Sequence, residues 1–135
     1  DREKALEVAD EARRNFPRLR ILARAYDRLH VYELHRHGVT DVERETFEGG
    51  LRLGVKTLMT LGLDETNAER AGRIFRRHDE AQLAEMERHF GDSEAYRKAA
   101  INYSGMLGDV MARDLGFNAA EQLEAAWALE EEWSG

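Results

Sequence analysis

The run from Glu43 to Gly49 holds the side chains best placed to bind a small ligand. It follows an expected β-strand and precedes a helical pattern, and open α/β sheets bind ligands at the carboxyl ends of their strands. The guanidinium group of Arg44 is suited to hold a carboxylate through two parallel hydrogen bonds. An ion pair between Arg44 and Glu43 or Glu48 is the simpler interpretation, so the spacing alone leaves both open.

A metal site is a second chemistry that the residue types allow. His30, Glu33 and His37 fall at i, i+3 and i+7, which places them on one face of a helix, and imidazole and carboxylate groups are ligands of zinc and other transition metals. No fourth ligand is indicated, and such trios arise easily in a chain that is 35% charged. We therefore expect a polar helix face here and no metal site.

Covalent catalysis finds little support among the nucleophilic residues. The chain has no cysteine, and its serines do not stand in a nucleophile-elbow setting. Acidic residues are so numerous that a pair of carboxylates carries no information about acid–base catalysis. We expect no enzyme. A second polar cluster, Ile74 to Glu80, is typical of a contact between helices or subunits.

The composition of the chain excludes several function classes. The net charge of −7 speaks against nonspecific nucleic-acid binding, and no run of 18 apolar residues exists that could span a membrane. The lack of cysteine excludes disulfides and Cys-ligated metal sites. Residues 91–135 carry nine acidic and three basic side chains, including Glu130–Glu132. This acidic third is interpreted as a solvated helix end or as a docking surface for a basic partner.

The first 45 residues alternate between helical and strand patterns. The expected elements are a helix over 2–15, a strand over 19–25, a helix over 28–37 and a strand over 39–43. Asp1 and Asp27 are expected to cap the two helices, and Gly38 to close the second. The continuous apolar run of the first strand is typical of a strand covered on both faces. This rhythm predicts a parallel α/β sheet. Because two strands make no stable open sheet, the segment resembles the second half of a doubly wound domain.

From Thr46 onward the pattern is helical only. Helices are expected over 47–61, 65–89, 93–114 and 119–133. Gly49, Gly50 and Gly54 lie inside the first of these, where each costs about 1 kcal/mol against alanine. They do not stand between a strand and a helix, as a phosphate-binding loop requires. We therefore expect them to permit close packing of helices.

The order and spacing of several motifs resemble a known family. These are Ile21–Arg28, then Gly38-Val39, then Glu43–Gly49, then Phe75-Arg76-Arg77. Over residues 1–90 they resemble the cytoplasmic regulatory (RCK/KTN) tail of the glutathione-regulated potassium efflux antiporters. Those proteins form part of the monovalent cation:proton antiporter-2 family. The last 45 residues match only loosely.

The resemblance implies an architecture. Residues 1–45 would be the C-terminal half of a Rossmann-like domain, 46–62 a crossover and dimerisation helix, and 63–135 a helical extension. The fold class is thus a mostly helical α/β fragment with two short parallel strands. The glycine-rich nucleotide loop of such proteins lies upstream, so no cofactor is expected in this fragment. A nucleotide, NAD or AMP, is a possible ligand of the complete domain.

The resemblance also implies a function and site residues. The tail would form a homodimer on the cytoplasmic face of the bacterial inner membrane and gate the potassium:proton antiporter domain of its own chain. Glutathione, which binds between the subunits, closes such transporters, and electrophile adducts open them. Arg44, Thr46, Phe47 and Asp79 would contact the ligand. Asp79 stands where the family has an asparagine, and its charge would repel the anionic tripeptide, so the ligand could differ.

Two alternatives concern partners. A flavin oxidoreductase-like ancillary subunit is a possible partner, as in the family. The chain could also be a structural dimerisation or docking module that binds no small molecule.

Overall fold

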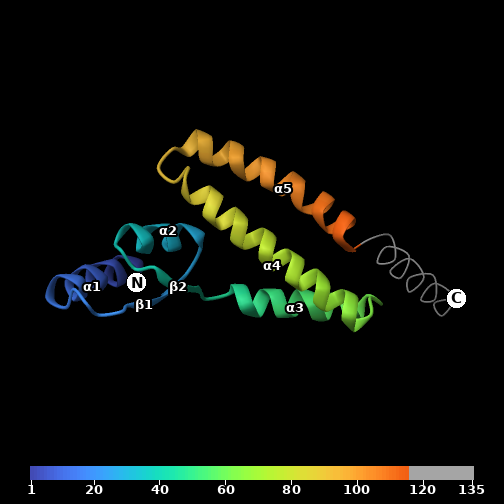
Figure 1. The fold of residues 1–135 in the computed structure, drawn as a ribbon, viewed down its shortest axis with the longest axis horizontal. Helices are drawn as coiled ribbons and strands as arrows, with labels where there is room; N and C mark the ends of the chain where they lie inside the picture. Colours follow the sequence, from blue (N-terminus) through green and yellow to red (C-terminus); the bar gives the residue numbers. More distant parts are fainter. Residues whose placement is uncertain (116–135) are drawn as a thin grey trace, which may run out of the picture. The chain divides into compact units, whose positions relative to one another are not determined.

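The protein was studied as a computed structural model that describes residues 1–115 (Figure 1). The expected helix over 119–133 and the acidic run Glu130–Glu132 lie outside these described residues. The chain forms two compact units, Asp1–Glu48 and Gly49–Gly135. The three-part division expected from the sequence stays a prediction.

The first unit is the expected alternation of helices and parallel strands. Its elements are α1 (Arg2–Asn15), β1 (Leu22–Ala25), α2 (Arg28–Arg36) and β2 (Asp41–Arg44). The two strands pair in parallel, with Leu22 opposite Asp41 and Ala25 opposite Arg44. Because α2 connects two parallel strands, the unit contains the β–α–β crossover that characterises α/β proteins. The predicted fold class is confirmed.

The predicted helix ends of this unit are also confirmed. The Asp1 carboxylate accepts a hydrogen bond from the Glu3 backbone N–H at 3.0 Å, and the Asp27 carboxylate accepts one from the His30 N–H at 2.8 Å. Each bond satisfies a backbone donor that the first turn of a helix leaves open. Gly38 follows α2 with φ of 76°, a conformation that glycine adopts without steric cost.

Both strands are shorter than predicted. The Val39 backbone N–H donates to the Leu34 carbonyl at 3.0 Å in the closing turn of α2. It therefore cannot join a strand, and β2 begins only at Asp41. The parallel register then places the start of β1 at Leu22 rather than at Leu19.

The expectation that β1 is covered on both faces is wrong for the described residues. The Leu22 side chain is 70% exposed, and Leu19 is exposed as well. Leu22 and Arg24 are exposed, whereas Ala23 and Ala25, which alternate with them along β1, are shielded, so the described residues cover one face of the strand. The core lies instead between the helices and the inner side of the sheet. Its buried apolar residues are Ala9, Ala25, Val31, Tyr32, Leu34 and Val39.

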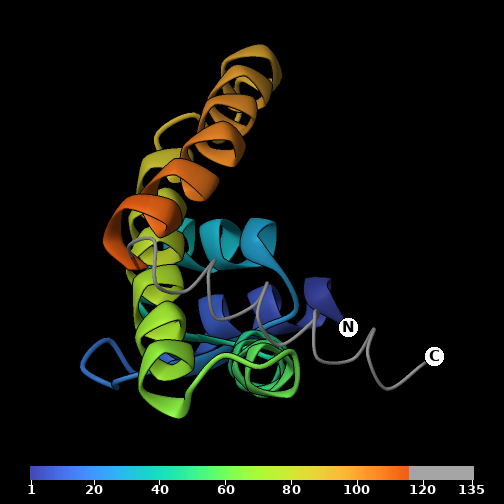
Figure 2. The same ribbon diagram turned by 90° about the vertical axis from the view of Figure 1, so that its right-hand side faces the viewer.

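The second unit is helical. It contains most of α3 (Phe47–Thr60), together with α4 (Glu65–Glu87) and α5 (Ser93–Leu115). Asp64 caps α4 by accepting from the Asn67 N–H at 2.9 Å. Gly62 and Gly91 take positive φ in the turns between helices. The helices α4 and α5 lie side by side as an antiparallel hairpin (Figures 1 and 2).

The glycines of α3 do not permit close packing within the described chain. A Cβ atom placed at Gly49, Gly50 or Gly54 would meet no atom within 4 Å. The close approach occurs instead at Gly72 of α4, where an added Cβ would lie 2.7 Å from Cγ2 of Val55. A packing role of the α3 glycines against a second copy of the chain stays a prediction.

Candidate ligand site at the carboxyl edge of the sheet

A small pocket of about 210 Å³ opens where both strands of the first unit end. Its lining residues come from the segments directly after β1 and around the end of β2. They are Tyr26, Asp27, Arg28, Arg44, Thr46 and Phe47. The structure thus brings together three of the four residues singled out in the sequence, at the edge where open α/β sheets bind ligands. Their role as ligand contacts stays a prediction.

Arg44 and Phe47 form one wall of this carboxyl-edge pocket. The guanidinium carbon of Arg44 lies 3.9 Å from the centroid of the Phe47 ring. This distance is typical of a cation–π contact, which holds the guanidinium plane against the ring face. The contact restricts a long side chain and places its charge at the sheet edge. The alternative ion pair of Arg44 with Glu43 or Glu48 stays a prediction.

Asp27 is the acidic member of the pocket. One of its carboxylate oxygens accepts both the His30 backbone N–H, at 2.8 Å, and Nη2 of Arg2, at 2.5 Å. The backbone hydrogen bond from His30 lowers the pKa of Asp27, and the Arg2 charge adds to the effect. Asp27 is therefore an anion at neutral pH.

Tyr26 rests on a buried histidine. The Tyr26 and His30 rings are stacked with centroids 5.2 Å apart and an interplanar angle of 13°. The Tyr26 N–H donates to Nδ1 of His30 at 3.2 Å, and the His30 side chain is completely buried. Burial lowers the pKa of His30, and the Arg2 charge acts in the same direction. A neutral imidazole therefore supports Tyr26, which remains 49% exposed.

Sequence reasoning missed Tyr26, Asp27 and Arg28 as pocket residues, and gave Asp27 only the role of a helix cap. Their position in the sequence could have identified them, because they directly follow the first strand, just as Glu45 and Thr46 follow the second. The parallel register places Ala25 opposite Arg44. Residues after both strands must therefore meet at one edge.

The three candidate metal ligands have separate surroundings. His30 is buried beneath Tyr26, while Glu33 lies 3.4 Å from Nε of Arg2. His37 pairs through Nδ1 with the Asp10 carboxylate at 2.7 Å. No group of three or more histidine or acidic side chains in the described part of the chain is arranged to hold a metal ion. The geometry therefore gives the metal interpretation no support.

Asp79, the fourth predicted ligand residue, belongs to the second unit. It lies on α4 and is only 3% exposed. The neighbouring His78 ring meets Tyr103 of α5 edge to face, with centroids 5.7 Å apart. This bears out a helix–helix contact at the predicted polar cluster, while a role of Asp79 in ligand binding stays a prediction. Further along the chain, Nε2 of His89 lies 3.7 Å from Oε1 of Glu85, at i and i+4.

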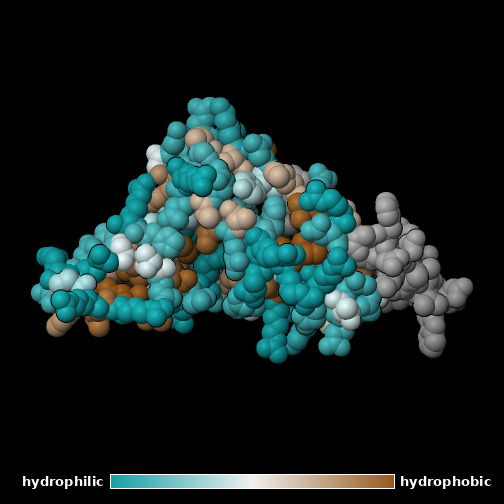
Figure 3. Space-filling view, in the orientation of Figure 1, coloured by the Kyte–Doolittle hydropathy of each residue, from teal (hydrophilic) through white to brown (hydrophobic). Residues whose placement is uncertain are grey.

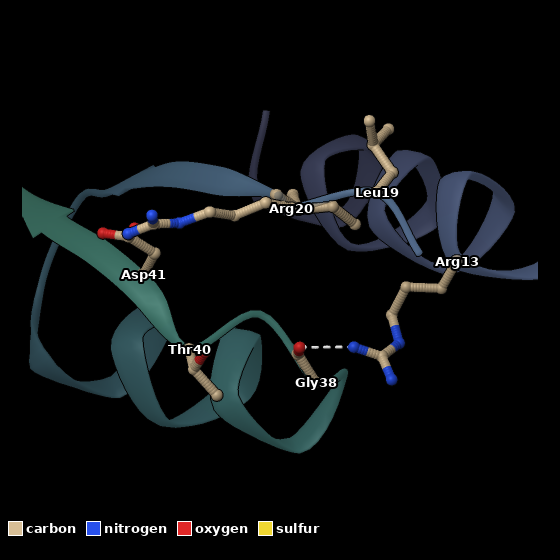
Figure 4. Close-up of a pocket in the computed structure, with 7 residues that line it drawn as sticks. Arg13, Leu19, Arg20, Gly38, Thr40 and Asp41 are labelled. Atoms are coloured by element: carbon tan, nitrogen blue, oxygen red, sulfur yellow. Dashed lines mark hydrogen bonds and ion pairs between the residues drawn. The ribbon is translucent and has the colours of Figure 1, made fainter. Parts of the chain in front are cut away.

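A larger hollow of about 530 Å³ lies at the opposite, amino-terminal edge of the sheet (Figure 4). Its two arginines are engaged by protein oxygens. Arg13 donates to the Gly38 carbonyl at 2.5 Å, and Arg20 donates to the Asp41 carboxylate at 2.5 and 3.0 Å. The Asp41 carboxylate cancels one of the two positive charges. The larger volume of this hollow therefore does not by itself make it a better candidate for a ligand site than the carboxyl-edge pocket.

None of the helices in the described chain is both long and apolar enough to cross a membrane.

Comparison with known proteins identifies relatives of the chain. Residues 49–130 match the family model described as the potassium efflux system KefB C-terminal domain. A solved structure, the Shewanella denitrificans Kef C-terminal domain in AMP-bound form, is 45% identical with a TM-score of 0.64. The similarity covers 67% of this chain and 58% of that one. These matches confirm the resemblance seen in the sequence. Because the matched residues make up more than half of it, the chain belongs to the KefB-type C-terminal domain family of potassium efflux systems.

Proposed function

We propose that this chain is the ligand-sensing part of a regulatory region that controls a potassium:proton antiporter. The observation that carries the proposal is the carboxyl-edge pocket, where Arg28 and Arg44 stand beside the aromatic rings of Tyr26 and Phe47. Membership of a potassium efflux family supports the transport context. The region would act at the cytoplasmic face of the bacterial inner membrane, on the antiporter domain of the same chain.

The chemistry of the pocket favours a small anion. A guanidinium group recognises carboxylate and phosphate oxygens in a bidentate manner, and the Thr46 hydroxyl adds a hydrogen-bonding group. Glutathione, which has two carboxylates, is the ligand that the family resemblance suggests. The Shewanella structure holds AMP, which supports nucleotide binding by the complete domain. The ligand class is therefore a carboxylate or phosphate of low molecular weight.

Homodimerisation is the second part of the proposal. The exposed surface of α3 that includes Gly49, Gly50, Leu53 and Gly54, here called the α3 face, supports it. None of the described α3 residues is buried, and the Leu53 side chain is 67% exposed. Open space surrounds Gly49, Gly50 and Gly54, which allows another backbone to approach closely. Exposed apolar side chains are not confined to α3, since they show between hydrophilic ones at several places on the visible face of the space-filling view (Figure 3). A second copy of the chain would cover the α3 face.

Gating would then follow from a shift between dimer geometries. A ligand can bias such an equilibrium only by its difference in affinity for the two geometries. A tenfold difference corresponds to about 1.4 kcal/mol, and reciprocity requires that the gate state changes ligand affinity by the same factor.

Calorimetry on the full-length protein tests ligand binding. We expect glutathione or AMP to bind more tightly than millimolar, and Arg44→Ala to weaken binding at least tenfold, because it removes a charged hydrogen-bond donor. Arg24→Ala is the matched control, since Arg24 is an exposed β1 residue that pairs with Glu45 at 3.9 Å outside the pocket. The proposal fails if neither compound binds, or if both variants behave alike.

The alternative is a dimerisation or docking module without a small-molecule ligand, and the same exposed α3 face favours it. A flavin oxidoreductase-like ancillary subunit would be the docked partner. It predicts dimers in solution together with a flat titration for both compounds. Ligand binding that depends on Arg44 excludes it.

A further inference from the structure

An ion pair ties the start of α1 to the carboxyl-edge pocket, although its two residues are 25 positions apart. Nη2 of Arg2 lies 2.5 Å from Oδ1 of Asp27, while Nε of the same side chain lies 3.4 Å from Oε2 of Glu33. Arg2 itself does not line the pocket. Asp27 is thus the pocket residue with which Arg2 is paired.

Asp27 creates an electrostatic problem for an anion site. Among the six residues that line the pocket it carries the one carboxylate, and a negative charge there opposes the binding of a carboxylate or phosphate. The carboxylate is held in this position by a hydrogen bond. Its Oδ1 atom caps α2 through the His30 N–H at 2.8 Å, and removing such a cap destabilises a helix.

The charge balance of the pocket depends on what faces Asp27. Arg28 and Arg44 contribute two positive charges and Asp27 one negative charge at the pocket wall. The Arg2 guanidinium offsets the Asp27 charge from outside the pocket lining, so that Asp27 subtracts less from the positive charge that Arg28 and Arg44 bring to the pocket wall. Without Arg2, the Asp27 carboxylate would compete with the ligand for them.

We propose that Arg2 is a positioning residue that neutralises Asp27 and thereby makes the carboxyl-edge pocket selective for small anions. This inference rests on the proposed function. It assigns a ligand-related role to α1, whose other contacts are with α2 and the turn that follows it. It also explains how one aspartate can cap a helix and line an anion site.

A double-mutant cycle on the full-length protein tests the inference, with glutathione and AMP as the probes. Arg2→Met keeps most of the apolar stem and removes the charge, and we expect it to weaken binding about three- to tenfold, as one uncompensated charge in a solvated site would. Asp27→Asn keeps the helix cap, because asparagine caps as well as aspartate. It should bind at least as tightly as the wild type.

The decisive variant combines both changes. Arg2→Met with Asp27→Asn should recover the affinity of Asp27→Asn alone, since no carboxylate then lines the pocket; Glu33, the other partner of Arg2, is not among the lining residues. A purely structural role of Arg2 predicts instead that the double variant binds as weakly as Arg2→Met. The matched control is Arg20→Met, which removes an ion pair of the same length, 2.5 Å to Asp41, at the opposite sheet edge. It should not change binding.

The outcomes separate this inference from the proposed function. If the wild type binds a probe and Arg44→Ala weakens binding at least tenfold, but Arg2→Met changes nothing, only the role of Arg2 is refuted. A double variant that shows no recovery refutes it too. If the wild type binds neither probe, the proposed function fails and the inference falls with it.

Discussion

The contact between Gly72 and Val55 gives a stability prediction whose size follows from the structure. Replacing Gly72 by alanine would place Cβ 2.7 Å from Cγ2 of Val55 and 4.0 Å from Cδ1 of Leu51. Alanine gains up to about 1 kcal/mol over glycine in a helix interior. An ordinary carbon–carbon contact is about 3.5–4.0 Å, so the branched Val55 side chain would have to move by about 1 Å. Overpacking of this kind costs about 1–3 kcal/mol, and we expect a net loss of about 1 kcal/mol.

Thermal denaturation followed by circular dichroism measures this loss. For a unit of this size, about 1 kcal/mol lowers Tm by roughly 4–8 °C. Gly108→Ala on α5 is the matched control, because nothing lies within 4 Å of its added Cβ, and it should raise Tm. Adding Val55→Ala to Gly72→Ala should cost less than Val55→Ala costs the wild type. A Gly72→Ala protein as stable as the Gly108→Ala protein would refute the packing of α3 on α4.

Three further predictions follow from single residues. Burial lowers the pKa of His30 below 6.5 in the folded state, so its contribution to stability is complete above pH 6.5 and declines as the pH falls below it. The urea midpoint should therefore drop between pH 7 and pH 5.5 by more in the wild type than in His30→Gln, and equal slopes would contradict this. Gly38→Ala should lower the free energy of unfolding by about 1–2 kcal/mol, because φ is 76° and the new Cβ would displace the Arg13 guanidinium. An unchanged urea midpoint would contradict the positive φ of Gly38 in the turn after α2. In Gly54→Leu the new side chain would lie in open space within one chain, so the helix content should not change. It would obstruct a second copy at α3, and analytical ultracentrifugation should show a shift from dimer to monomer. A dimer that persists would exclude the α3 interface.

Local signals explain why much of the fold could be predicted. Asp1, Asp27 and Gly38 act within one helical turn, so the type of residue fixes the helix end wherever the rest of the chain lies. The alternation of helical and strand patterns likewise predicts parallel pairing without knowledge of the contacts. These features are properties of short windows of sequence.

What the sequence could not reveal depends on contacts between distant segments. The burial of His30 is one example, because its spacing with Glu33 and His37 is equally compatible with an exposed metal-binding face. The pairing of Arg2 with Asp27 is another, since it joins residues 25 positions apart. The close approach at Gly72 is a third example. Only the partner side chain, Val55, distinguishes Gly72 from the other helical glycines.

A crystal structure of the full-length protein with glutathione or AMP tests the central claim most directly. The account predicts density for a carboxylate or phosphate within hydrogen-bonding distance of the Arg44 guanidinium, at the pocket formed with Tyr26 and Phe47. A ligand bound only elsewhere, with this carboxyl-edge pocket filled by water at saturating concentration, would contradict it.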